Sequence, residues 1–138
     1  MSTSEVNRIY DAAKSFRAPG LAALTADATI GVLPLDKLVN VRPSSQRNKL
    51  GAEKYEVVID VSSVVVSGGE TYALNVDVGA TGAANVRVGS VNVTKPGQYI
   101  VTLDAQTIEN INVAREEIAL KLDVTGAGSS IVLAAWIV

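Results

Sequence analysis

The sequence predicts an all-β domain, a sandwich or barrel of about eight short strands. Aliphatic residues alternate with polar ones over most of the chain after residue 20, which is the pattern of strands with one buried face. Clusters of Gly, Pro, Asn and Ser separate these runs, as turns do in such domains. The hydrophobic fraction is 48% and the aromatic fraction only 4%, so the core must consist of aliphatic side chains, whose branched members favour strands.

Length and composition limit what the chain can do. Its 138 residues fit a single domain. It has no cysteine and no histidine, which excludes disulfides, thiolate nucleophiles and imidazole bases. A formal net charge of -2 is unfavourable for nucleic-acid binding, because phosphate contacts need a basic face. We therefore expect a protein that is not an enzyme, that holds no cofactor or metal, and that has no nucleic-acid partner.

No signal peptide or membrane-spanning helix is predicted. The first five residues lack a basic start followed by an apolar centre. The longest apolar run is residues 131–138 at the C-terminus, which is far shorter than the about 20 residues of a spanning helix. We expect this run to be a strand that is buried on both faces, within the sandwich or against another subunit. No membrane partner is expected.

The N-terminal stretch from Ser4 to Arg17 differs from the rest in its periodicity. Its apolar residues recur at spacings of three and four, on one stripe of a helix: Val6, Ile9, Tyr10, Ala13 and Phe16. Pro19 and Gly20 end this predicted helix. An extended arm that packs its apolar residues on a neighbouring subunit fits the same pattern, and both interpretations stay open. We assign residues 1–20 to this helix or arm and residues 21–138 to the β domain.

The first four predicted strands precede residue 80. Residues 28–33 and 38–42 flank Pro34, and a polar, basic segment from Arg42 to Lys54 is expected to be a long surface loop. Alternation then predicts a strand from Lys54 toward Val66 and another over residues 72–78. The Ser-Gly-Gly turn between them indicates a hairpin.

The remaining predicted strands lie in the C-terminal half. Residues 86–93 alternate, but the phase reverses at Gly89–Ser90, which predicts a β-bulge or a tight bend there. A Pro96–Gly97 turn leads to a strand over residues 99–103, and the last two strands cover residues 118–124 and 131–138. No helix of crossover length separates the strands, so we expect antiparallel pairing.

No set of catalytic residues emerges from the sequence. Asp60 and Asp77 occupy outward positions of adjacent predicted strands, but paired carboxylates need a shaped cleft, and a solvated strand face explains both. The Gly79–Gly82 loop lacks the following helix and the Lys-Ser/Thr pair of a phosphate-binding loop. Asn92–Thr94 fits a glycosylation sequon but falls within a predicted strand, so we regard it as a chance match.

Positive charge concentrates in and around the predicted loop. The segment contains Lys37, Arg42, Arg47, Lys49 and Lys54 against only Asp36 and Glu53. Such asymmetry can dock a protein on an acidic neighbour, because the Arg guanidinium pairs with carboxylates; a solvated loop is the alternative. The candidate partner-binding residues are Ile9, Tyr10, Phe16 and Arg17, then Arg42, Arg47 and Lys49, and finally Trp136, which its apolar strand places in the core or an interface.

Four segments together resemble tailed-bacteriophage capsid decoration proteins, also called cement proteins. They are Tyr10–Phe16, Leu24–Thr29, the turn and strand Pro96–Asp104, and the apolar C-terminal strand. The likeness covers most of the chain in layout. It implies a jelly-roll-like antiparallel β-sandwich that forms a homotrimer and sits on the outside of an icosahedral head.

The resemblance also implies a partner and a location. In that family, arms and loops near the base clamp neighbouring major capsid subunits, so the N-terminal stretch and the basic loop are the expected contact regions on the major capsid protein. The chain is then a structural virion protein, assembled in the host cytoplasm. The alternative is a glycan-binding β-sandwich module of a tail fibre or an adhesin, which needs exposed aromatic residues over a concave face. One Trp, four Tyr and one Phe are a small supply for that role.

Overall fold

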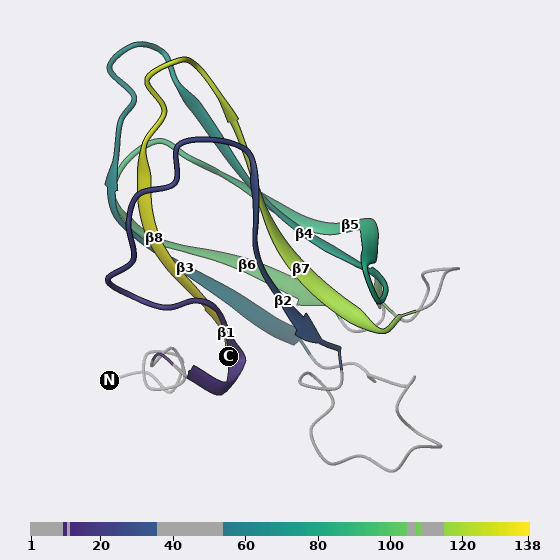
Figure 1. Ribbon diagram of the computed structural model, residues 1–138. Coiled ribbons are helices and arrows are strands. Elements are labelled where there is room, and N and C mark those ends of the chain that lie inside the picture. Colours follow the sequence, from purple (N-terminus) through teal and green to yellow (C-terminus); the bar gives the residue numbers. More distant parts are fainter. Residues whose placement is uncertain (1–9, 11, 36–53, 105–106, 109–114) are drawn as a thin grey trace, which may run out of the picture.

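Two antiparallel sheets packed face to face make up the protein (Figure 1). The structure is a computed structural model that describes residues 10, 12–35, 54–104, 107–108 and 115–138. Within these ranges eight strands form sheet A, in the order β1-β8-β3-β6, and sheet B, in the order β2-β7-β4-β5. The predicted all-β sandwich is confirmed.

The strands follow the predicted order along the chain. A single turn of 3-10 helix, Ala12–Lys14, precedes the first of them. The strands are β1 (Ser15–Arg17), β2 (Ala28–Pro34), β3 (Lys54–Val64), β4 (Thr71–Ala80), β5 (Ala83–Val93), β6 (Gly97–Asp104), β7 (Glu117–Thr125) and β8 (Ile131–Ile137).

The strands pair as the two arms of one long hairpin that has been rolled up. β1 pairs with β8, β2 with β7, β3 with β6 and β4 with β5, each antiparallel. This pairing is the jelly-roll arrangement, which agrees with the expectation. The predicted hairpin of β3 and β4 is wrong, because β3 belongs to sheet A and β4 to sheet B. The chain crosses between the sheets there, and the apolar faces of the two strands meet across the core.

Alternating aliphatic side chains fill the space between the sheets. Val57, Ile59 and Val61 of β3 oppose Leu74 and Val76 of β4, and all are at most 2% exposed. Full burial of each such side chain stabilises the fold by about 1.5–3 kcal/mol relative to an exposed position. The period-two pattern of the sequence therefore determines which face of each strand points inward.

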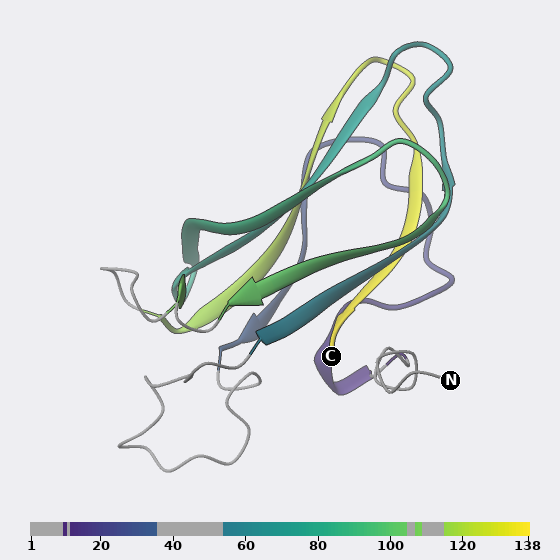
Figure 2. The ribbon, with the colours of Figure 1, turned by 180° about the vertical axis from the view of Figure 1, so that it is seen from behind.

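Two glycines let the sheets close against each other at their edges. An added Cβ on Gly31 of β2 would collide with the backbone carbonyl of Phe16 in β1, and on Gly89 of β5 it would lie 2.5 Å from Cγ1 of Val101 in β6. Both glycines lie beside a register shift, so the bulge predicted at Gly89 is confirmed. Figure 2 shows the chain passing from β5 in one sheet to β6 in the other.

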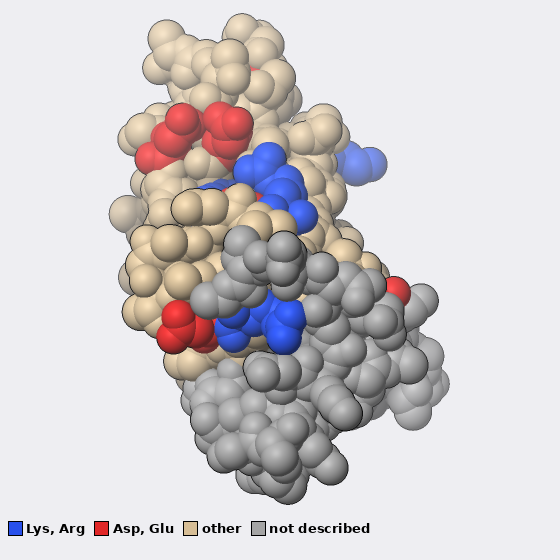
Figure 3. Space-filling model, turned by 90° about the vertical axis from the view of Figure 1, so that its right-hand side faces the viewer, with Lys and Arg blue, Asp and Glu red and all other residues tan. Residues whose placement is uncertain are grey.

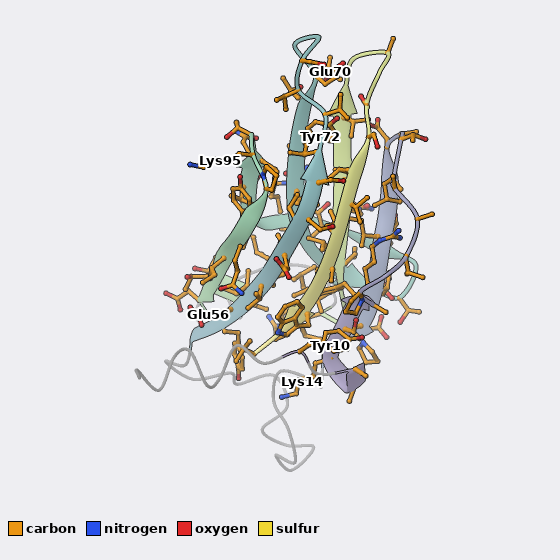
Figure 4. All side chains as sticks on the ribbon, turned by 90° about the vertical axis from the view of Figure 1, so that its left-hand side faces the viewer. Tyr10, Lys14, Glu56, Glu70, Tyr72 and Lys95 are labelled. Carbon is orange, nitrogen blue, oxygen red and sulfur yellow. The ribbon has the colours of Figure 1, made fainter. Side chains whose placement is uncertain are left out.

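A buried tyrosine holds two loops together at the upper end of the sandwich. The Tyr72 hydroxyl donates a hydrogen bond to the carbonyl of Val65 (2.6 Å) and accepts one from the amide of Ser130 (2.9 Å). These residues belong to the β3–β4 and β7–β8 connections. Glu70 lies above them, where an added Cβ on Gly126 would be 2.8 Å from its Cγ (Figure 4). This end is therefore tied by side chains as well as by strands.

The N-terminal stretch differs from its predicted form. Residues 15–17 form a strand that pairs with β8, so the predicted helix is wrong there; residues 1–9 and 11 lie outside the described residues. Because β1 belongs to sheet A, the sandwich begins no later than Ser15, before the boundary predicted at residue 20. The predicted strand at 38–42 and the loop up to residue 53 also lie outside the described residues.

We predict that Gly31→Ala destabilises the protein by about 3 kcal/mol, because the new methyl group meets backbone that cannot rotate away. Thr29→Ala, on the exposed side of the same strand, is the control and should change the free energy of unfolding by less than about 0.5 kcal/mol. Urea unfolding monitored by circular dichroism measures both. Equal midpoints for the two variants would contradict the close approach of β1 and β2.

Candidate partner-binding surface

The strand ends determine where the basic segment leaves the sandwich. Pro34, the last residue of β2, pairs with Glu117, and Lys54, the first residue of β3, pairs with Asp104. These pairs lie at the end of the sandwich that also carries Tyr10 and the C-terminus, which we call the lower end (Figures 1 and 4). Arg42, Arg47 and Lys49 lie outside the described residues, as does Ile9. The described strand ends on either side of the three basic residues, Pro34 and Lys54, both lie at the lower end (Figure 1).

Phe16 is buried in the core between the sheets and presents no surface to a capsid partner. Its side chain is 6% exposed and belongs to the core between the sheets, because β1 aims it inward at the point where Gly31 lets β2 approach. The stripe of apolar residues in the N-terminal stretch therefore contributes Phe16 to the chain's own core. This corrects its assignment to the partner-binding set.

Tyr10 and Trp136 pack together on the outer face of sheet A. Their ring centroids lie 5.4 Å apart with an interplanar angle of 86°, an edge-to-face contact worth about 0.5–1.5 kcal/mol beyond area burial. Trp136, Val58 and Ala134 form a small cluster that is separate from the main core, with Tyr10 and Val138 packed against it. Trp136 is 5% exposed, so β8 is buried on both faces, as predicted.

The register places a row of apolar side chains across this outer face. Val58 of β3 pairs with Ile100 of β6 on one side and with Trp136 of β8 on the other. The next outward position toward the upper end is Asp60, which is exposed. The outer face of sheet A is thus apolar near the lower end and polar above it. Sequence alternation alone does not predict this apolar patch, because it places Val58 on the outward face of β3 together with the polar residues Glu56 and Asp60.

Two buried donors near β1 have no acceptor. The Nε1 atom of Trp136 and the Nε atom of Arg17 are both inaccessible to solvent and make no hydrogen bond within the described part of the chain. Arg17 uses its Nη2 to donate to the carbonyl of Ala22, which leaves Nε unused. Buried Trp and Arg donors are normally paired. The contact between the N-terminal stretch and β8 is therefore less complete than the packing of the core.

The outer face of sheet B carries a charged cluster that the sequence analysis did not anticipate. Asp77 of β4 is 3% exposed and lies between Arg87 Nε of β5 (3.2 Å) and Lys121 Nζ of β7 (3.1 Å). Beside it, the Ser90 hydroxyl donates to Oδ1 of the buried Asn75 (2.7 Å). Lys and Arg side chains gather near the middle of this face, with acidic side chains above them (Figure 3).

This cluster corrects the interpretation of the two aspartates. Asp77 is a buried, ion-paired group rather than part of a solvated strand face. Asp60 lies on the outer face of sheet A and Asp77 on that of sheet B, so the sandwich separates them and they form no carboxylate pair. Lys121 also donates to the carbonyl of Ala84 (2.6 Å). The three charges therefore connect β7, β4 and β5 across the sheet.

The aromatic residues offer no exposed stacking surface. All six lie among the described residues. Phe16, Tyr55, Tyr72 and Trp136 are buried, and Tyr10 and Tyr99 are partly buried. The Tyr99 hydroxyl donates to the carbonyl of Lys95 (2.7 Å) and so holds the β5–β6 turn.

Two other kinds of site are absent from the described ranges. No three acidic, His or Cys side chains there gather closely enough to hold a metal ion, and no helix there has the length and hydropathy to cross a membrane. A cleft of about 270 Å³ lies at the upper end, lined by Glu70, Thr71, Tyr72, Asn92, Val93 and Thr94. Comparison of the chain with protein-family models, curated proteins and solved structures gives no significant match.

We predict that Tyr10→Ala shifts the fluorescence emission of Trp136 to longer wavelength, because it removes the ring that covers the indole. Trp136 is the single tryptophan of the chain, so the spectrum reports on this contact alone. Stability should fall by about 1–2 kcal/mol. Lys95→Ala, at the upper end, should leave the spectrum unchanged. An unshifted spectrum in the Tyr10 variant would place Tyr10 away from the indole.

Asp77→Asn should destabilise the protein by about 2–4 kcal/mol, because it leaves two cationic side chains without their shared carboxylate. The matched control is Asp60→Asn, which removes an exposed carboxylate from the other sheet and should cost less than about 0.5 kcal/mol. Thermal unfolding of both variants measures the difference. If the two substitutions have the same effect, Asp77 is solvated after all.

Proposed function

We propose that the chain is a structural virion protein that binds the outside of an icosahedral phage head and bridges neighbouring major capsid subunits. The observation that supports this most directly is the convergence at the lower end. The end of β2 and the start of β3, which flank the segment with Arg42, Arg47 and Lys49 in the sequence, lie at the same end of the sandwich as Tyr10 and Trp136 (Figures 1 and 4). A surface assembled from several chain segments suits a partner that is large and composed of several subunits.

The chemistry of this end supports a protein partner. It combines the partly buried Tyr10, which covers the buried Trp136, with the basic residues of the segment between β2 and β3 in the sequence. Arg and aromatic side chains are enriched in protein interfaces. Arg42, Arg47 and Lys49 pair with carboxylates on the capsid surface in this proposal. In the family that the chain resembles, such contacts hold the capsid against internal pressure. The protein acts as a homotrimer on the virion exterior.

The jelly roll is consistent with this role without determining it. The same architecture occurs in viral capsid proteins and in lectins, and fold alone does not assign a function. The aromatic residues favour the structural role over the glycan-binding module, because stacking on a sugar needs an exposed ring and Tyr10, Tyr99 and the four buried aromatics leave none fully exposed. The proposal places the binding surface at the lower end, where Tyr10 lies on sheet A beside the C-terminus (Figures 1 and 4).

The proposal predicts binding to mature phage heads that have been stripped of decoration protein, and no binding to isolated capsid monomers. Binding should weaken as salt is raised, because screening reduces the pairing of exposed charges. The triple variant Arg42→Glu, Arg47→Glu and Lys49→Glu should bind at least roughly tenfold more weakly. Co-sedimentation with heads measures the bound fraction.

The charge control is Lys95→Glu, which adds negative charge at the upper end and should bind like the unmodified protein. Light scattering should give the mass of a trimer. An unmodified protein that stays monomeric and does not sediment with heads would refute the proposal. Binding of the protein to a glycan array would instead support the glycan-binding module. Full binding by the triple variant would move the contact surface away from the basic segment.

A further inference from the structure

Tyr10 and residues 12–17 cover the outer edge of β8. We call these residues the strap. Ser15 pairs with Trp136, and its hydroxyl donates to the carbonyl of Ala135 (3.4 Å). Tyr10 rests on the Trp136 ring, and Phe16 enters the core beside Gly31. These contacts tie the strap to the sandwich through side chains and a three-residue strand.

An exposed hinge joins the strap to the rest of the chain. Residues 18–23 are all exposed, and Gly20 has a φ of 82°, a conformation that other residues rarely adopt. The next tie to the sandwich is the backbone pair of Leu24 with Ile131. Six extended residues span about 20 Å, so the hinge is long enough to carry the strap to a neighbouring molecule.

The closed monomer leaves defects on both sides of the strap contact. The buried Nε1 of Trp136 and Nε of Arg17 lack acceptors, and the register shifts between Ser15 and Arg17. In the hinge, Leu21 is 49% exposed. Among the described residues, no other buried side-chain donor or acceptor lacks a hydrogen-bond partner. The unpaired donors and the register shift therefore lie where the strap closes on its own chain.

We propose that the strap is exchanged between copies of this chain, so that the strap of one molecule lies on β8 of another. Exchange reproduces the contacts of Tyr10, Ser15 and Phe16 at little cost in free energy, because the residues that meet are the same. It also places the hinge between two molecules, where Leu21 gains a cover and the Nε of Arg17, which lies next to the hinge, can meet a new acceptor. The Nε1 of Trp136 lies inside the reproduced contact, so exchange leaves it unchanged. The partner is thus a second copy of the chain, and exchange needs no phage head.

Disulfide trapping tests the exchange directly, because the chain has no cysteine of its own. Ser15 and Trp136 are directly opposed, and opposed residues of antiparallel strands lie at distances that a disulfide spans. The variant Ser15→Cys with Trp136→Cys should therefore form covalent links between chains, visible as dimers or larger species on a denaturing gel. Exclusively intrachain disulfides would overturn the proposal.

The matched control is Ser63→Cys with Val132→Cys, an opposed pair of β3 and β8 that exchange leaves within one chain. It should give intrachain disulfides alone. Because loss of Trp136 can impair folding, a second variant retains it and inserts six Gly and Ser residues after Gly20. A longer hinge favours closure on the same chain, so this variant should lose at least half of the oligomer seen for the unmodified protein by light scattering. An unchanged mass, or an unmodified protein that is monomeric at every concentration, would also overturn the proposal.

Discussion

Burial of β8 on both faces is the constraint on which the rest of the structure depends. One face supplies Ile131, Leu133 and Ile137 to the core between the sheets, and the other supplies Ala134 and Trp136 to the cluster outside sheet A. A strand that is apolar on both sides cannot lie at an open edge of a soluble sheet without exposing one side to water. Its position between β1 and β3 follows from that requirement.

The jelly roll satisfies this requirement by bringing the N-terminal stretch back over the C-terminal strand. Pairing of β1 with β8 closes one edge of sheet A, and Gly31 then allows β2 to follow in the opposite sheet. The other edge closes where Gly89 admits the side chain of Val101. Tyr72 reinforces the upper end and the Asp77 cluster reinforces the outer face of sheet B, whereas the lower end carries Tyr10, the C-terminus and the strand ends at Pro34 and Lys54 (Figures 1 and 4).

Sequence patterns identified the strands well because alternation reports directly on burial. They also located the irregularity at Gly89, because a change of phase within one run predicts a bulge or a tight bend, and β5 has a register shift there. They failed to predict strand pairing, which depends on residues that are distant in the sequence. The turn after Val66 is like that of a hairpin, but whether β4 pairs with β3 or crosses to the other sheet is decided by packing over the whole domain.

For the candidate surface too, the sequence predicts what depends on neighbouring residues and fails where distant residues decide. Trp136 was correctly expected in the core or an interface, since its strand is apolar throughout. Phe16 was misassigned, because the spacing of apolar residues near a terminus does not tell whether they meet the chain's own core. The sequence predicts a solvated Asp77 because its partners, Arg87 and Lys121, come from two other strands. A basic residue ten positions after a buried-strand aspartate carries no signal by itself.

Amide hydrogen exchange along β8, followed by NMR, tests the central claim most directly. A strand covered on both faces and paired on both sides exchanges only through opening of the whole domain. The account predicts that the β8 amides that bond to β3 are among the slowest in the protein, and that they exchange as slowly as those in the middle of β4. Exchange at the rate of an exposed edge strand would contradict it.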